Sequence, residues 1–176
     1  MRTGRWAAAA TLAGALLVAE DARAGDVSFF IDASTGPGAA VFHYFGLGGD
    51  YAGFSFHIQT CMGARFAKRW GAGGGGGFQP LIGSSGFFGG GFVGACAEVE
   101  PIERLHIDAT VGFGGVGGTG AATVGPALSI GGSYDLVGDQ KARMFLGLRV
   151  LAFPGWSNGR NGFYISPTFS IGFRWW

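Results

Sequence analysis

Apolar side chains occupy every second position in the last part of the chain. Between residues 163 and 175 this series runs from Phe163 through Ile165 and Phe169 to Trp175, and most of the positions between are small or polar. A period of two residues is typical of a β-strand with one apolar face. A strand that crosses a bilayer at a tilt of roughly 45° needs about 9 to 11 residues, so this segment is long enough to cross.

The same alternation recurs in seven further segments. They cover residues 27–34, 54–66, 70–78, 87–99, 105–113, 122–135 and 142–152. An arginine that faces lipid at mid-bilayer costs about 2 to 4 kcal/mol, so Arg143 and Arg149 identify the inward face of the last of these segments. The pattern predicts an all-β fold, an eight-stranded antiparallel up-and-down transmembrane β-barrel.

The predicted connections alternate in length. Short turns fall near residues 67–69, 100–103 and 137–141, and longer loops fall near residues 35–52, 79–86, 114–121 and 153–162. Bacterial outer-membrane barrels have an even strand number, short periplasmic turns and longer outer loops. Residues 39–47 are apolar enough to form a strand, but a ninth crossing would put the two chain ends on opposite sides. We therefore assign them to the first long loop.

The N-terminal segment has the features of an export signal. Arg2 and Arg5 precede an apolar run over residues 6–19, and an Ala-Arg-Ala sequence ends at Ala24. These features predict a signal peptide over residues 1–24, which leaves residues 25–176 as the barrel. The rest of the sequence contains no run of 18 uninterrupted apolar residues, so we expect strands to make any membrane crossing.

Glycine dominates the composition, with 37 of 176 residues and a run over residues 73–77. Such an excess also fits a soluble, glycine-rich secreted β-protein. Disordered chains are poor in aromatic residues, whereas this chain has 17 Phe and 5 Trp in phase with the alternation. A membrane barrel is therefore favoured, in which inward glycines make room for larger neighbours.

The charge balance excludes one class of partner. Lys and Arg total 12 and Asp and Glu total 11, and the predicted signal peptide holds Arg2, Arg5 and Arg23 against Glu20 and Asp21. The remaining chain is formally neutral. Nucleic acid is not an expected partner, because phosphate binding needs a basic surplus on one face.

Aromatic residues near the predicted strand ends indicate two interfacial girdles. Phe56 and Phe87 belong to the outer rim. The girdle residues expected to face lipid are Phe54, Phe66, Trp70, Phe113, Tyr134, Phe163, Phe173 and Trp175. A spanning barrel needs such girdles. A soluble barrel would instead bury its aromatic residues on the inner face, which the alternation predicts to be small and polar.

Through its signal peptide, strand number, loop asymmetry and C-terminal strand, the whole mature chain resembles the small eight-stranded bacterial outer-membrane barrels of the OmpA/OmpX type. The resemblance concerns the fold alone. It implies location in the outer membrane of a Gram-negative bacterium, contact with outer-membrane lipid, and recognition of the C-terminal strand by the barrel-assembly machinery. In such barrels the terminal aromatic residue usually faces lipid. Here Trp175 has that phase, and Trp176 falls in the inward phase.

Eight charged residues share the inward phase. The acids are Asp32, Glu98, Asp108 and Asp135, and the bases are Arg65, Arg143, Arg149 and Arg174. An eight-stranded barrel is just wide enough to be filled by its own side chains, so we expect these groups to pair within a filled polar lumen. The alternative is a narrow gated pore that carries ions or protons through the same network.

Ser55 and His57 lie two positions apart on one inward face, and His106 also points inward. A barrel enzyme that modifies lipid would need a nucleophile and a base near the outer leaflet. Lipid approaches from outside, whereas this pair faces the lumen. The sequence also lacks CxxC and HExxH spacings. We therefore predict no catalytic residue, no cofactor and no metal site.

Cys61 and Cys96 share the inward phase on strands that one further strand separates. Exported proteins meet conditions that permit disulfides, and a bridge needs Cα atoms within about 7 Å. Second-neighbour strands lie roughly 9 to 10 Å apart, because adjacent strands are about 4.8 Å apart. Only a flattened wall beside the glycine run would close the gap, so we expect two free thiols.

Together these features predict a monomeric, non-catalytic integral outer-membrane protein. Its role would be structural in the envelope, or that of a surface-binding module whose specificity lies in residues 35–52 and in residues 154–162 with Trp156. The alternatives are a lipid-modifying barrel enzyme, the narrow gated pore and the soluble secreted β-protein.

Overall fold

The computed structural model describes residues 27–44, 49–66, 69–83, 86–118, 121–139, 141–157 and 160–176. These residues form eight strands: β1 (Ser28–Tyr44), β2 (Gly49–Phe66), β3 (Trp70–Gly83), β4 (Gly86–Ile102), β5 (Leu105–Gly118), β6 (Ala121–Gly138), β7 (Ala142–Ser157) and β8 (Arg160–Trp175). The predicted signal peptide, residues 1–24, lies outside the described residues. The described residues include no helix long and apolar enough to span a membrane.

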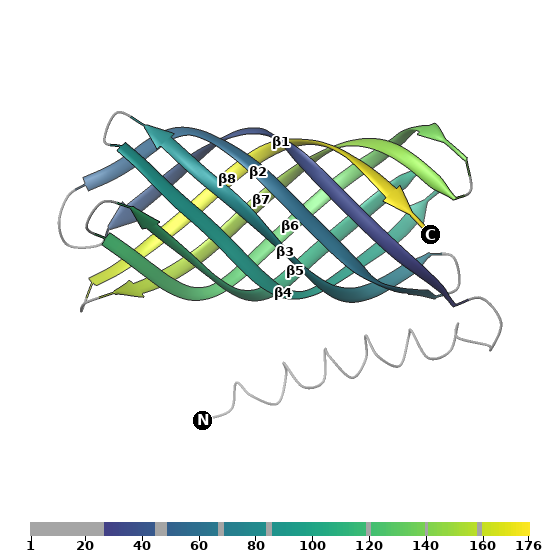
Figure 1. Ribbon diagram of the computed structural model, residues 1–176, viewed down its shortest axis with the longest axis horizontal. Coiled ribbons are helices and arrows are strands. Elements are labelled where there is room, and N and C mark those ends of the chain that lie inside the picture. Colours follow the sequence, from purple (N-terminus) through teal and green to yellow (C-terminus); the bar gives the residue numbers. More distant parts are fainter. Residues whose placement is uncertain are drawn as a thin grey trace, which may run out of the picture.

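The strands form a closed antiparallel barrel, in which each pairs with its sequence neighbours and β1 also pairs with β8 (Figure 1). The predicted fold class is confirmed. We call the end that holds the β2–β3, β4–β5 and β6–β7 connections, together with Trp176, the turn end, and the opposite end the loop end. The beginning of β1 and the end of β8 meet at the turn end, where Ile31 pairs with Trp175.

Strand β1 is much longer than the alternation predicted. Its pairing with β2 continues from Ser28 to Tyr44, so the assignment of residues 35–44 to a long loop is wrong. The Thr-Gly-Pro-Gly sequence at residues 35–38 has the composition of a turn, yet it lies in the wall. A methyl group at Gly38 would lie 2.9 Å from the Cα atom of Thr168, so a close approach between strands, rather than a turn, requires glycine here.

The other long loops are also mostly strand. β3 continues to Gly83, β5 to Gly118 and β7 to Ser157, so the loops predicted at residues 79–86, 114–121 and 153–162 are wrong for these parts. The described parts of the predicted long loops are therefore strand, and residues 45–48, 84–85, 119–120 and 158–159 lie outside the described residues.

One turn shows how the turn end is organised. Between β6 and β7, the exposed Asp139 carboxylate accepts hydrogen bonds from the backbone N–H groups of Lys141 at 2.7 Å and Ala142 at 2.9 Å. These bonds, the one from Lys141 first, lower the pKa of Asp139 below its usual value. The side chain thus closes the turn by satisfying backbone donors.

The alternation predicted that the inner face would be small and polar throughout. The structure shows that this prediction is wrong for half of the barrel. In the loop-end half, an inner apolar cluster fills the barrel; it consists of Ala40, Phe42, Leu81, Phe88, Phe92, Val116, Ala127, Leu151, Phe153 and Tyr164. The rings of Phe153 and Tyr164 stack with centroids 4.8 Å apart. Large aromatic side chains can occupy inward positions here because the barrel holds side chains instead of a water-filled channel.

Phe153→Ala should lower the free energy of unfolding by about 3–5 kcal/mol, because it leaves a cavity within the inner apolar cluster. Urea titration of the barrel refolded in detergent micelles measures this loss. Phe169→Ala, on the outer face of β8, is the matched control and should cost clearly less. Equal losses for the two variants would contradict the packing described for the loop-end half.

Candidate functional site

The inner charged network of the turn-end half is the most elaborate site in the barrel. Because side chains alternate across each strand, all eight predicted charged residues project inward, and they come from seven strands. Asp32 comes from β1, Arg65 from β2, Glu98 from β4, Asp108 from β5, Asp135 from β6, and Arg143 and Arg149 from β7, with Arg174 from β8 making a seventh strand. β3 carries glycine in the corresponding region.

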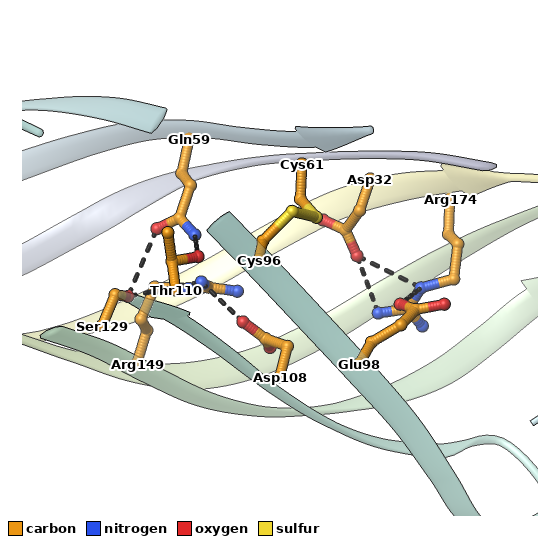
Figure 2. Close-up of a disulfide and its surroundings, with 10 residues drawn as sticks. All are labelled: Asp32, Gln59, Cys61, Cys96, Glu98, Asp108, Thr110, Ser129, Arg149 and Arg174. Atoms are coloured by element: carbon orange, nitrogen blue, oxygen red, sulfur yellow. Dashed lines mark hydrogen bonds and ion pairs between the residues drawn. A yellow bond between two sulfur atoms is a disulfide. The ribbon is translucent and has the colours of Figure 1, made fainter. Parts of the chain in front are cut away.

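Arg174 is the hub of the network. Its guanidinium is fully buried and donates to Asp32 from Nη2 at 2.8 Å and to Asp135 from Nη1 at 2.8 Å. Its Nε atom lies 3.3 Å from Glu98. A buried charge is tolerated only when it is paired and hydrogen-bonded. Three carboxylates from three strands meet this requirement (Figure 2 shows Asp32 and Glu98 beside Arg174).

A second group of ion pairs lies closer to the turn end. Arg65 pairs with Glu100 at 2.5 Å, and Asp135 accepts from Arg143 at 3.1 Å. The Nε2 atom of His106 lies 3.1 Å from the Asp135 carboxylate. Asp135 therefore joins this group to Arg174, and the two groups form one network.

Glu100 is a network residue that the sequence analysis assigned to a turn. The structure places it within β4, and its carboxylate approaches Arg65 and, at 3.8 Å, Arg143. The signal was available in the alternation, since Cys96, Glu98 and Glu100 occupy every second position. Pro101 and Glu103 are typical of a turn, so the predicted strand ended at Val99, three residues before the observed end of β4 at Ile102.

Trp176 covers the network at the turn end. Its ring centroid lies 4.4 Å from the guanidinium carbon of Arg65 and 5.2 Å from that of Arg143, distances that allow cation–π attraction. Its backbone N–H donates to the Lys141 carbonyl at 3.1 Å. The inward phase noted in the sequence thus has a physical counterpart, because the last side chain packs against two inward arginines.

Arg149 and Asp108 form a separate pair deeper in the barrel, with 2.7 Å between Nη1 and Oδ1. Arg149 also donates to Ser129 at 3.4 Å. Gln59 links Ser129 to Thr110 through two hydrogen bonds of 3.5 Å (Figure 2). These polar side chains occupy the level between the Arg174 hub and the inner apolar cluster.

The expectation of free thiols is wrong, because Cys61 and Cys96 form a disulfide with Cα atoms 6.2 Å apart. The bridge joins β2 to β4 across the inner side of β3. There Cys61 is the register partner of Gly75, and Cys96 that of Gly73. A methyl group at Gly75 would lie 2.6 Å from the Thr60 carbonyl oxygen and 3.3 Å from the Cys96 sulfur. The bare glycine wall therefore lets second-neighbour strands approach within bridging distance.

A small cavity of about 10 Å³ borders the disulfide. Its lining includes both cysteines, the carboxylates of Asp32, Glu98 and Asp108, and the side chains of Gln59 and Arg149. This volume is roughly what one water molecule requires. Among the described residues, no group of three or more His, Cys, Asp or Glu side chains is placed to hold a metal ion.

Ser55 and His57 do not form a nucleophile–base pair. The Ser55 hydroxyl lies 3.0 Å from that of Ser166, and His57 Nδ1 lies 3.1 Å from the Gly36 carbonyl oxygen. Both side chains are buried within the barrel. Each is engaged by a partner other than the one that nucleophilic catalysis would need.

The predicted girdle residues lie on the outer surface. Phe54, Trp70, Phe113, Tyr134, Phe163, Phe173 and Trp175 are exposed, and Phe66 is half-buried. The rings of Phe173 and Trp175 stack at 5.7 Å on β8. Trp156, singled out in the predicted outer loop, belongs to β7, and its pairing with β6 and β8 places its backbone in the wall.

Two solved structures are similar to this chain. Neisserial surface protein A (NspA), a small eight-stranded outer-membrane barrel, matches with a TM-score of 0.51 at 18% identity, over 86% of this chain and 99% of that chain. Ail, the attachment invasion locus protein of Yersinia pestis, solved with the heparin analogue sucrose octasulfate, matches with a TM-score of 0.44 at 12% identity, over 83% of this chain and 99% of Ail.

No protein-family model matches the chain, and no curated protein sequence matches it significantly. The likeness to NspA confirms the predicted resemblance at the level of the fold. At such low identity the function must be argued from the chain's own residues.

Arg174→Met should destabilise the barrel by about 3–5 kcal/mol, because it leaves buried carboxylates without their shared cation. The free energy of unfolding in urea, measured in detergent micelles, tests this. Arg143→Met removes a more exposed guanidinium and should cost less. A loss for Arg174→Met no larger than that for Arg143→Met would show that Arg174 is not the hub.

The paired substitution Cys61→Ser and Cys96→Ser should lower the free energy of unfolding by about 2–4 kcal/mol, since a disulfide restricts the unfolded chain. The folded barrel should still form, because the strand pairing does not depend on the bridge. Urea titration under non-reducing conditions compares this variant with the unaltered chain. The difference should vanish when both are measured in the presence of a strong reductant.

Proposed function

We propose that this chain is a non-catalytic integral outer-membrane protein of a Gram-negative bacterium, with an envelope-structural role. The observation that carries the proposal is the combination of a closed barrel with an apolar outer face. Large exposed apolar side chains on the outer face include Phe29, Ile58, Phe78, Val93, Val111, Ile130, Leu148 and Phe169, which come from all eight strands.

An apolar surface of this extent supports membrane insertion over the soluble alternative. Soluble monomers rarely expose contiguous apolar patches larger than a few hundred Å², whereas here apolar rows surround the whole barrel. The strands have 14 to 18 residues, more than the roughly 9 to 11 that a crossing requires. A closed barrel also satisfies the backbone polar groups that lipid cannot.

The filled interior argues against the gated-pore alternative. At the loop end, the inner apolar cluster fills the lumen. At the turn end, the lumen is filled by Arg174 with its three carboxylate partners and by Trp176. The one cavity described between them is about 10 Å³. An ion crossing the barrel would have to displace both fillings, and hydrophobic packing offers it no polar ligands.

Strand extension at the loop end favours the envelope-structural role over surface binding. Specificity in the outer loops was the basis of the binding hypothesis, but most of that sequence belongs to paired strands. The lipid-modifying hypothesis has no support from Ser55 and His57, which are buried and bonded elsewhere. We assign the turn end to the periplasm, where the C-terminal strand would meet the barrel-assembly machinery, and outer-membrane lipid to the apolar face. Within this assignment the barrel functions as a monomer.

Envelope fractionation followed by electrophoresis of unboiled and boiled samples tests the proposal. The chain should be recovered with outer membranes, and boiling should change its mobility. Leu148→Arg should abolish both results, because Leu148 is 61% exposed on the outer face and arginine there costs about 2 to 4 kcal/mol. Leu148→Phe, the matched control, should behave like the unaltered chain. Recovery in the soluble fraction with no heat-dependent mobility would refute membrane insertion.

A further inference from the structure

The Cys61–Cys96 disulfide lies inside the finished barrel, where large molecules cannot approach it. Cys96 is buried and Cys61 is half-buried, and both cysteines border a cavity of about 10 Å³. Figure 2 shows the bridge surrounded by inward side chains, with Arg149 and Gln59 on one side and Asp32 and Arg174 on the other. The space around the sulfurs admits roughly one water molecule.

Both routes along the barrel axis are occupied. From the loop end, the inner apolar cluster blocks the way with Phe42, Phe92 and Phe153 among its members. From the turn end, Trp176 covers Arg65 and Arg143, and the fully buried Arg174 lies beyond them. A protein that exchanges disulfides must bring its own sulfur into contact with a cysteine sulfur, and neither route permits that contact.

We propose that the Cys61–Cys96 disulfide is formed before the barrel closes, by a protein thiol oxidase that acts on the open chain. A thiolate of one cysteine attacks the reactive disulfide of the oxidase and forms a mixed disulfide. The thiolate of the second cysteine then attacks this bond, which forms the Cys61–Cys96 bridge and releases the oxidase as a dithiol. The two cysteines lose two electrons and two protons, and the oxidase disulfide gains them.

The topology allows this order of events. β2, β3 and β4 are consecutive, and the two cysteines are separated by 35 positions in the sequence. Pairing of these three strands alone aligns Cys61 with Gly75 and Cys96 with Gly73. The sulfurs can meet before Trp176 is in place and before β1 pairs with β8. A three-strand unit can therefore be bridged while its inner face is still open.

Refolding of the full chain in vitro tests the order. The reduced chain is diluted from urea into detergent micelles, and a protein thiol oxidase is added either at dilution or after unboiled samples show the mobility of the closed barrel. Denaturing alkylation with a polymer-linked maleimide then counts the remaining thiols. We expect oxidation at least tenfold slower when the oxidase is added after closure.

The control is an exposed thiol at the turn end. Lys141→Cys in the Cys61→Ser, Cys96→Ser background carries one cysteine in an exposed turn, and it should react with the oxidase at similar rates before and after closure. Oxidation of Cys61 and Cys96 in the closed barrel as fast as in the open chain would overturn the proposal. That the chain is exported to an oxidising compartment rests on the proposed function. The refolding experiment depends only on the fold, so the proposed function and the proposed order of disulfide formation can fail separately.

Discussion

Closure of this barrel requires the first strand to pair with the last, and one ion pair lies directly on that seam. Asp32 and Arg174 are register partners between β1 and β8, and the Arg174 guanidinium reaches Asp32 at 2.8 Å. The same guanidinium binds Asp135 on β6 and approaches Glu98 on β4. Backbone pairing alone would close the seam, but this cation also joins it to strands on other parts of the wall.

The two halves of the lumen are filled by different physical means. The loop-end half is packed with apolar side chains, which need only complementary shape to be stable without water. The turn-end half contains charges, which are stable in a dry interior only when each has a partner. The disulfide lies with the polar group of Gln59, Asp108 and Arg149 between the Arg174 hub and the inner apolar cluster (Figure 2). Side chains therefore fill the lumen in both halves of the barrel, apart from the small cavity beside the disulfide.

Much of this arrangement could be predicted because inward and outward positions follow from local alternation. The inward phase of Arg149 and Arg174 and the outward phase of Leu148 and Trp175 needed no knowledge of neighbouring strands. Glu100 was missed although it shares the inward phase, since Pro101 suggested a turn. The long loops were predicted for a similar reason. Glycine and proline usually mark turns, but in a narrow barrel glycine also permits close approach between strands, as Gly38 does beside Thr168.

The sequence by itself determined the strand number, the face of the side chains within the strands that it predicted, and eight of the charges that enter the lumen. Only the tertiary structure decided which of these groups meet. Pairing of Arg174 with three carboxylates depends on the relative shift of four strands, and strand shift is a property of the closed barrel rather than of any one strand. The disulfide is the clearest case. At ordinary strand spacing, Cys61 and Cys96 would be too far apart to form a bridge. The glycine run of β3, which lies between them, lets the wall curve, and their Cα atoms are 6.2 Å apart.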